Sequence, residues 1–490
     1  MLRASILMPD GHENIESLLL SLGGFSTFQL WASFAILSPE VPAAMIAMLP
    51  VFVGANHANE EALIGGIIGN SSSSESGEDE NYFVGFQAGS VIQEWNLRGS
   101  SAWVPEMFTS CFMMGMMSGA ICGSQLADRY GRRKIHFLLI LTMSTFGILS
   151  ALAPNPWVYA VLRFFAGVGV GGFYCIYSIY LMEFLTPGWR VICGSISFWF
   201  AGEMALAFCA YLIPSWRLLS LAAALPAFLG LMTFPWLPET PRWLLCHTQT
   251  SQATSVFSQI SSWNGTPPPS PATIASLQKV ITTEEENSGS SGRTSHSLTL
   301  LWSNFRCRLA IFIALFFSVA FSYYGITFNA KNLSGNPYLN MGYMGLIDMI
   351  AFPAGSVFSN ALGRRRVTAL FLSMASITLC VLIGLEIYFS GELAEIYVTI
   401  LSFLARFGVA GAWGVVVCFC QESFPTVVRS TALGICCLMA NTGGVLAPQI
   451  AFVGTVWPMF PHVIFTAIII ASTGMTWLLP EMSGKPLENF

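Results

Sequence analysis

Charged residues are scarce in this sequence. Only 10% of its 490 residues are Asp, Glu, Lys or Arg, whereas 54% are hydrophobic. Soluble domains usually carry about 25% charged residues, so a chain this poor in charge cannot cover its surface against water. The composition, with a mean hydropathy of +0.63, therefore excludes an ordinary soluble protein and indicates that lipid surrounds much of the chain.

Other absences narrow the function. No basic patch interleaved with aromatic residues is found, so nucleic acid is not expected as a ligand. The twelve cysteines lie mostly inside apolar runs and none lies in residues 54–103, which argues against a disulfide-stabilised outer domain. The sequence shows no residue arrangement for covalent catalysis and no metal-ligand spacing. We therefore expect no enzyme activity, no cofactor and no metal site.

The sequence does contain a series of long apolar runs. A helix needs roughly 20 apolar residues to cross a bilayer, and twelve segments meet this requirement. We expect an all-α membrane protein with twelve transmembrane helices. The predicted spans are 28–53, 104–124, 135–155, 157–182, 190–212, 216–237, 307–329, 339–362, 367–389, 394–420, 430–452 and 458–480.

Two polar segments divide these spans. The first, 54–103, is predicted to be an extracellular loop. The second, 238–306, has the composition of a linker that can hold short surface helices. The predicted parts are a cytoplasmic N-terminus (1–27), an N-terminal six-helix bundle (28–237), a cytoplasmic linker (238–306), a C-terminal six-helix bundle (307–480) and a cytoplasmic tail (481–490).

The distribution of Lys and Arg sets the topology. Most of the 21 basic residues fall in inner loops and termini if both chain ends are cytoplasmic, as the positive-inside rule requires. The sequons at Asn70 and Asn332 then fall in outer loops and are predicted glycosylation sites, whereas Asn264 falls in the cytoplasmic linker and is not.

Three landmarks occur in the same order in both halves of the chain. The segment 128–133 (DRYGRR) has its counterpart in 360–365 (NALGRR). An Arg-Phe pair opens the fourth span at 163 and the tenth at 406, and Pro-Glu closes the sixth and twelfth spans at 238–239 and 480–481. The repetition predicts two pseudo-symmetric bundles, the parallel-repeat plan of many secondary transporters.

These motifs resemble the major facilitator superfamily, most closely its organic-ion branch of cation, anion and carnitine transporters. The resemblance covers nearly all of the chain outside the two polar segments. It is carried by FQLW, SQLADRYGRRK, RFFAGVGVGGFYCIYSIYLMEF, WRLLSLAAALPAF, PETPRWLL, ESFPTVVRSTALG and PEMSGKPLENF.

The resemblance implies a monomeric carrier of a small organic solute. Such a carrier lies in the lipid bilayer and works by alternating access, as a uniporter or coupled to protons or sodium. The plasma membrane is the expected location, with an intracellular vesicle as the alternative. A sugar-porter-like carrier and a transporter-like protein that acts only as an interaction partner remain alternatives. No loop resembling a selectivity filter favours a channel.

The resemblance also implies an inner gate of acids and bases at the cytoplasmic rim. Charge pairs there can hold one conformation and break in the other. The alternative is that these residues are topology determinants and solvated loop charges. The gate residues are Asp128, Arg132, Glu183, Arg190, Glu239, Arg242, Arg364, Glu422, Arg429 and Glu481.

Ionisable residues inside spans are candidates for function, because burying a charge in lipid is costly. Asp348 is the best acidic candidate for the substrate cavity, and Glu203 can couple protons, bind a cation or lie at an interface. Arg163 and Arg406 are either partners of buried acids or cavity residues, while Glu386, near an outer helix end, is expected to be solvated.

Neutral residues stand where the family places charges that select the sign of the substrate. Asn441 occupies the position of an acid in cation carriers and of an arginine in anion carriers, although it can equally make an interhelical hydrogen bond. Phe352 stands where some anion carriers have lysine. Both argue against an organic anion and leave organic cations, zwitterions and neutral solutes open. The predicted cavity is completed by Tyr323, Tyr324 and Trp413, whose rings suit flat or cationic solutes.

Overall fold

The computed structural model describes residues 15–54, 89–186, 189–190, 193, 197–287, 301–303, 305–333, 335–388, 392–457 and 459–482. The described residues form helices and turns, with no strand among them. Among the described residues, ten helices are long and apolar enough to cross a membrane, and two shorter apolar helices complete the twelve predicted spans.

The N-terminal half contains spans one to six. The first span is built from α2 (Thr27–Leu37), α3 (Glu40–Met48) and α4 (Pro50–Val53), and the sixth from α13 (Trp216–Ala224) and α14 (Ala227–Leu231). The spans between them are α8 (Val104–Tyr130), α9 (Arg132–Ala151), α10 (Pro156–Met182) and α12 (Trp199–Leu212).

The C-terminal half contains spans seven to twelve. These are α19 (Arg306–Phe328), α20 (Pro337–Leu362), α21 (Arg364–Tyr388), α22 (Glu392–Ser423), α23 (Thr426–Val456) and α24 (Met459–Thr476). Smaller helices lie outside the spans: α1 (Ile15–Ser21), α7 (Val91–Glu94), α15 (Pro241–Cys246), α16 (Thr250–Asn264), α17 (Pro271–Asn287), and the 3-10 turns η2 (Gly99–Ser101) and η3 (Asn329–Asn332).

Prolines explain why the first span is not one straight helix. Pro39 and Pro50 stand at its two breaks, where their missing N–H cannot continue the helical hydrogen-bond ladder. The first break makes Glu40 the opening residue of α3. A carboxylate is favoured there, because the N-terminus of a helix carries partial positive charge. The break therefore gives a buried acid a place in the middle of the span.

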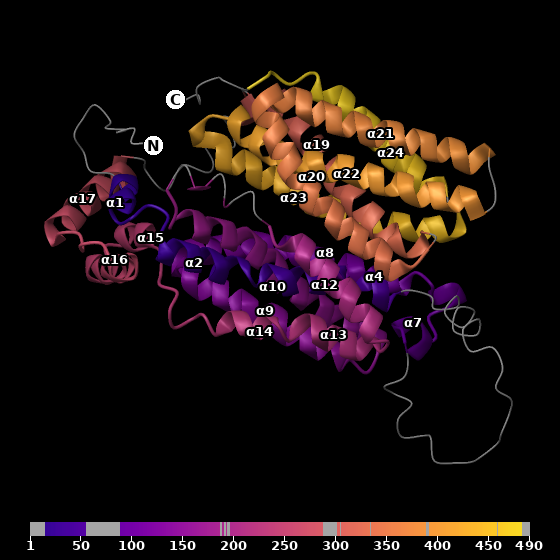
Figure 1. Ribbon diagram of the computed structural model, residues 1–490, viewed down its shortest axis with the longest axis horizontal. Coiled ribbons are helices and arrows are strands. Elements are labelled where there is room, and N and C mark those ends of the chain that lie inside the picture. Colours follow the sequence, from indigo (N-terminus) through magenta and orange to yellow (C-terminus); the bar gives the residue numbers. More distant parts are fainter. Residues whose placement is uncertain are drawn as a thin grey trace, which may run out of the picture.

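The two halves lie side by side and diverge toward the end that carries α15, α16 and α17 (Figure 1). We call that end inner and the end that carries α7 outer. Contacts between the halves run along α8 and α23 and along α12 and α20. At the outer end, the Tyr338 ring stacks on Phe52 at 5.5 Å and meets Tyr211 edge-on at 5.9 Å. The outer side is therefore the closed side.

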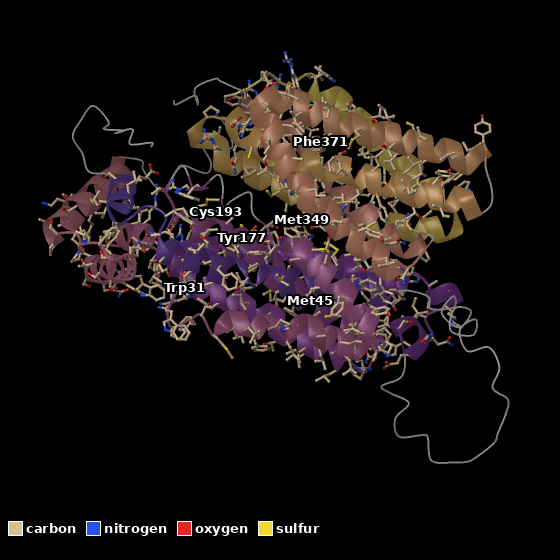
Figure 2. The ribbon with its side chains drawn as sticks, in the orientation of Figure 1. Trp31, Met45, Tyr177, Cys193, Met349 and Phe371 are labelled. Carbon is tan, nitrogen blue, oxygen red and sulfur yellow. The ribbon has the colours of Figure 1, made fainter. Side chains whose placement is uncertain are left out.

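Buried apolar side chains fill the interior of both halves and form one connected cluster. Figure 2 shows Met45 within the N-terminal half and Phe371 within the C-terminal half, and both side chains are buried.

Close packing in the N-terminal half depends on glycine. Gly115 and Gly119 of α8 face backbone carbonyls of α10, and Gly167 and Gly171 of α10 face backbone carbonyls of α8. At all four positions a Cβ atom would stand closer to those oxygens than van der Waals contact allows. The two small-xxx-small pairs interlock, as they do in other membrane helices that approach closely. The glycines of the fourth span therefore allow α10 to approach α8 closely.

The linker helix α16 is attached to the first span through its last residue, Asn264. Its amide oxygen accepts a hydrogen bond from the Phe28 backbone N–H at 3.0 Å, and its amide nitrogen donates to the Leu22 carbonyl at 2.8 Å. The Trp263 ring packs edge-on against Phe28, at 6.0 Å, and also meets Trp31. The linker is therefore tied to the N-terminal half.

Candidate functional site

An ion pair lies at the centre of the C-terminal half. Arg406 of α22 donates hydrogen bonds to both carboxylate oxygens of Asp348 on α20, at 3.0 and 2.8 Å. The hydroxyl of Tyr323 on α19 donates to the same carboxylate at 2.6 Å, and the guanidinium lies over the Tyr323 ring at 3.5 Å. Arg406 also donates to the Tyr323 carbonyl and to the Thr327 hydroxyl. Three helices are joined by one buried guanidinium.

A second acid reaches this ion pair from the other half. Glu203 of α12 accepts from Arg406 at 3.3 Å and from the indole N–H of Trp199 at 3.0 Å, both through Oε1. Its Oε2 is buried and has no hydrogen-bond partner among the described residues. The side chains of Glu203, Asp348 and Arg406 are all 0% exposed. We call these three residues the central triad.

Arg406 is thus the partner of two buried acids, one of the two interpretations that the sequence left open. Its counterpart in the repeat, Arg163, is different. Arg163 is also buried, but it donates to the Ile46 carbonyl at 2.8 Å and lies over the Phe112 ring at 4.3 Å. Two of its nitrogens have no hydrogen-bond partner among the described residues. The pseudo-symmetry of the backbone therefore does not extend to the buried charges.

A third buried acid, Glu40, lies in the N-terminal half. Its carboxylate accepts from the hydroxyls of Tyr174 and Ser197 and from the Phe198 backbone N–H, each at 2.6 Å. Tyr174 is packed edge-on against Trp199 at 5.3 Å, and Trp199 holds Glu203. A chain of aromatic contacts therefore connects Glu40 to the central triad.

The remaining predicted cavity residues lie on helices of the C-terminal half. Tyr324 is partly buried beside Tyr323, and Trp413 packs edge-on against Phe316. Phe352 packs against Gly414. Asn441 is half-buried on α23, next to a threonine whose hydroxyl is 4.0 Å from the Met117 sulfur on α8. That contact places the Asn441 segment where the two halves meet.

Sequence reasoning missed the surroundings of these residues. Thr327 was not singled out, although its hydroxyl contacts Arg406; a threonine in an apolar span carries no signal beyond its polarity. The expectation that Glu386 is solvated is wrong, because its side chain is 15% exposed and lies 3.1 Å from His462.

At the inner rim, acids and bases are paired within each half. Arg132 lies 3.0 Å from Asp128 and 3.3 Å from Glu183, and Arg364 lies 3.0 Å from Glu422. These pairs join residues of the same half in the conformation that the structure describes. The predicted role of the rim in holding the two halves together therefore stays a prediction for the other conformation.

The other basic rim residues also contact their own halves or solvent. Arg190 pairs with Glu16 at 2.8 Å, Arg429 donates to the Phe424 carbonyl at 3.3 Å, and Arg242 is exposed.

Glu239 and Glu481 cap helices. The Glu239 carboxylate accepts from the Arg133 backbone N–H at 3.1 Å, at the start of α9. Glu481 accepts from the Arg364 N–H at 2.8 Å, at the start of α21. In both halves the helix is preceded by a glycine with positive φ, +103° or +95°, whose missing Cβ leaves room for the carboxylate. The repeated Gly-Arg-Arg and Pro-Glu motifs thus form one contact in each half.

Removal of one cap should destabilise the protein modestly. We expect Glu239→Ala to lower the free energy of unfolding by about 1 kcal/mol, the usual cost of a lost helix cap. Burial raises the pKa of Glu239, so the folded state favours its protonated form. Its contribution to stability is therefore fully present below the pKa of an unfolded glutamate and is lost as pH rises through the folded pKa.

The melting temperature of the wild type should thus fall relative to that of Glu239→Gln as pH rises above the pKa of an unfolded glutamate. Asp128→Asn is the control, because that side chain is 73% exposed. If the difference in melting temperature between the wild type and Glu239→Gln did not change with pH, the stability effect of the raised Glu239 pKa would be contradicted.

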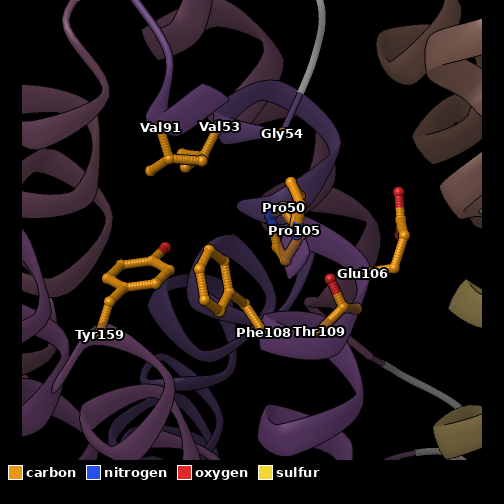
Figure 3. A pocket seen from close by; sticks show the side chains of 9 residues that line it. All are labelled: Pro50, Val53, Gly54, Val91, Pro105, Glu106, Phe108, Thr109 and Tyr159. Atoms are coloured by element: carbon orange, nitrogen blue, oxygen red, sulfur yellow. The ribbon is translucent and has the colours of Figure 1, made fainter. Parts of the chain in front are cut away.

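A small pocket lies at the outer end of the N-terminal half (Figure 3). Pro50, Pro105, Phe108 and Tyr159 are among the residues that line it. None of the predicted substrate residues lines it, so it is separate from the central triad.

Comparison with known proteins identifies the family. Residues 62–490 match the family described as "Sugar (and other) transporter". A Xenopus tropicalis protein named "Solute carrier family 22 member 15-like" is 30% identical over 97% of this chain and 95% of its own length. The chain belongs to this transporter family. The predicted resemblance to the organic-ion branch of the major facilitator superfamily is confirmed.

Other relatives agree with this membership. "Organic cation/carnitine transporter 4" of Arabidopsis thaliana is 30% identical over 82% of this chain and 76% of its own length. The inward-open xylose transporter XylE from E. coli has the same fold, with a TM-score of 0.65 and 17% identity over 93% of this chain and 98% of that one. As a member of the family, the chain is a multi-pass membrane transporter of small organic solutes, and its relatives are transporters, not enzymes.

Proposed function

We propose that this transporter carries small organic cations across the plasma membrane by alternating access, as a monomer. The substrate meets the aromatic residues between the two halves, in front of the buried acids. The observation that carries this proposal is the excess of buried carboxylate: Glu203 and Asp348 share the guanidinium of Arg406, and the buried Glu40 is bonded to hydroxyls and a backbone N–H, with no basic partner among the described residues. A negative low-dielectric site favours a positively charged solute.

The aromatic residues extend the negative charge toward the substrate. Tyr174 and Tyr324 are only partly buried, whereas Glu40 is fully buried and accepts a hydrogen bond from the Tyr174 hydroxyl at 2.6 Å. A phenol that donates to a carboxylate gains electron density, and an electron-rich ring binds a cation more strongly through its face. Tyr323 also donates to a carboxylate, that of Asp348, but its ring is already covered by the Arg406 guanidinium.

Two neutral residues also support a positively charged substrate. Phe352 and Asn441 bring no positive charge to the interface between the halves, so they do nothing to offset the acids. The names of two relatives, the Arabidopsis organic cation/carnitine transporter and the Drosophila melanogaster "Organic cation transporter protein", agree with a cationic or zwitterionic solute. The predicted glycan sites also remain proposals: Asn332 ends η3 at the outer side, and Asn70 lies outside the described residues.

Uptake in cells that express the full chain tests the proposal. We expect saturable uptake of labelled tetraethylammonium, weaker uptake of zwitterionic carnitine, and no uptake of anionic para-aminohippurate. Asp348→Ala should reduce cation uptake by at least about tenfold, since it removes an acid from the cluster and leaves Arg406 with Glu203 as its single acidic partner.

Glu386→Gln is the matched control, because it neutralises an acid of the same half that pairs with His462 outside the cluster. Surface labelling must show equal amounts of each variant. Preferential uptake of the anion, or full cation uptake by Asp348→Ala, would contradict the proposal. Absence of uptake of every solute, with normal surface amounts, would favour a role as an interaction partner.

A further inference from the structure

The charges of the central triad do not balance. Asp348 and Glu203 are both fully buried, and they share the one guanidinium of Arg406. If both acids were ionised, one negative charge would remain without compensation. An isolated buried charge is so costly that the group takes up a proton instead. One of the two carboxyl groups is therefore positioned to bind and release a proton.

The contacts distinguish the two acids. Asp348 receives two hydrogen bonds from Arg406, at 3.0 and 2.8 Å, and a third from the Tyr323 hydroxyl at 2.6 Å. Glu203 receives one hydrogen bond from Arg406, at 3.3 Å, and one from Trp199, and its Oε2 has no partner among the described residues. Both oxygens of Asp348 are occupied by donors, whereas Oε2 of Glu203 is the oxygen that is open to a proton.

The groups around Glu203 favour a proton over a metal cation. Arg406 faces it from α22 and Asp348 from α20, with Tyr323 and Tyr324 on α19. On α3 the titratable group is Glu40, which is bonded at the start of α12; on α13 it is Arg217, which is bonded to Glu94 at the outer end. The groups bonded to the Glu203 carboxylate are N–H donors from Trp199 and Arg406. A hard metal cation requires several oxygen ligands, and the guanidinium would repel it.

The ion pair between Glu203 and Arg406 also bridges the two halves. Glu203 belongs to the N-terminal half and Arg406 to the C-terminal half, 203 residues further along the chain. It lies where α12 packs against α20, and Gly345 of α20 lies directly against Phe200 and Met204 of α12. If the transporter opens to the outside, these helices separate and the pair must break. Asp348 stays with Arg406, because both belong to the same half.

We propose that Glu203 is the proton-binding residue of this carrier and that its protonation opens the outer gate. A proton from water binds Oε2, and the contact that is lost is the hydrogen bond between the Arg406 guanidinium and Oε1. A neutral Glu203 no longer attracts Arg406 across the interface, so the outward-open state gains population. Removal of the proton restores the pair and closes the outer side. This inference rests on the alternating access of the proposed function.

The outer gate can be followed with a cysteine reporter in the full chain. Phe52→Cys places a thiol at the closed outer contact with Tyr338, where the side chain is 5% exposed. Tyr388→Cys serves as the reference, since that residue is 82% exposed. Both are labelled from outside with sulfonatoethyl methanethiosulfonate, without any organic solute. The ratio of the two rates removes the effect of pH on thiol reactivity.

We expect the ratio to rise several-fold between about pH 7.5 and pH 5.5, with a limit of about tenfold per pH unit for one proton. In the Glu203→Gln background the ratio should be high at both pH values and no longer respond to pH. Glu386→Gln should leave the wild-type response intact. An unchanged pH response in Glu203→Gln, or no response in the wild type, would overturn the inference.

The outcome of the labelling experiment is independent of the uptake experiment that tests the substrate. Labelling is measured without solute, so a failure of cation uptake would contradict the proposed substrate and leave the proton site standing. Conversely, cation uptake that is normal in a protein whose outer gate ignores pH would retain the transporter proposal and exclude Glu203 as its proton site. A monodisperse elution profile of Glu203→Gln in detergent verifies that the variant is folded.

Discussion

Replacement of Arg406 with methionine is expected to cost about 3–5 kcal/mol of folding free energy and to abolish transport. Methionine fills a similar volume, so the loss is mainly electrostatic. Without the guanidinium, Asp348 and Glu203 remain fully buried with no positive partner. The Tyr323 carbonyl and the Thr327 hydroxyl also lose their donor.

The expected rescue separates charge from packing. A triple variant with Arg406→Met, Asp348→Asn and Glu203→Gln removes all three charges while keeping the side chains close to their original shapes. Replacing every member of a buried ion cluster is often neutral, whereas removing one member leaves an uncompensated charge. The triple variant should therefore be more stable than Arg406→Met, although it carries two more substitutions.

Thermal unfolding in detergent, followed by the amount of monodisperse protein, measures both variants. Each of the three substitutions keeps the Cβ atom, so the close contact of Gly345 with α12 is the same in both. Equal stability of the single and triple variants would show that charge compensation is not the role of Arg406.

The number and order of the spans could be predicted from the sequence because they depend on local composition. Twelve apolar runs, the repeated Gly-Arg-Arg and Pro-Glu motifs and the glycines of the fourth span each carry their signal within a few residues. The positive φ of Gly131 and Gly363 is also a local feature, because a glycine between two helices usually marks a sharp turn of the chain.

The partners of the buried charges could not be predicted in this way. Glu203 and Arg406 meet across 203 residues of sequence and between two halves, and no local pattern reports such a contact. The sequence could show that a charge in a span needs a partner, but not which of several acids provides it. For the same reason Arg163 and Arg406 looked equivalent, although an acid faces only the second of them at hydrogen-bond distance among the described residues.

The interface between α8 and α10 is the place where one added methyl group should do most harm to folding. Gly171 lies against the Met116 backbone, so a Cβ atom has no space unless the helices move apart. Overpacking of this kind typically costs about 1–3 kcal/mol, and a backbone contact cannot relax as a side chain can. We expect Gly171→Ala to reduce the yield of folded protein and to lower its melting temperature.

Gly384 provides a matched control, because it also lies inside a spanning helix, α21, but a Cβ atom there would have no neighbour within 4 Å. Alanine in a helix interior is more favourable than glycine by about 0.5–1 kcal/mol, so Gly384→Ala should be neutral or stabilising. The two substitutions add the same methyl group and should shift the melting temperature in opposite directions. If both variants melted at the same temperature, the close approach of α8 and α10 would not be what limits stability, and the reciprocal glycine pairs would have to serve the movement of the halves instead.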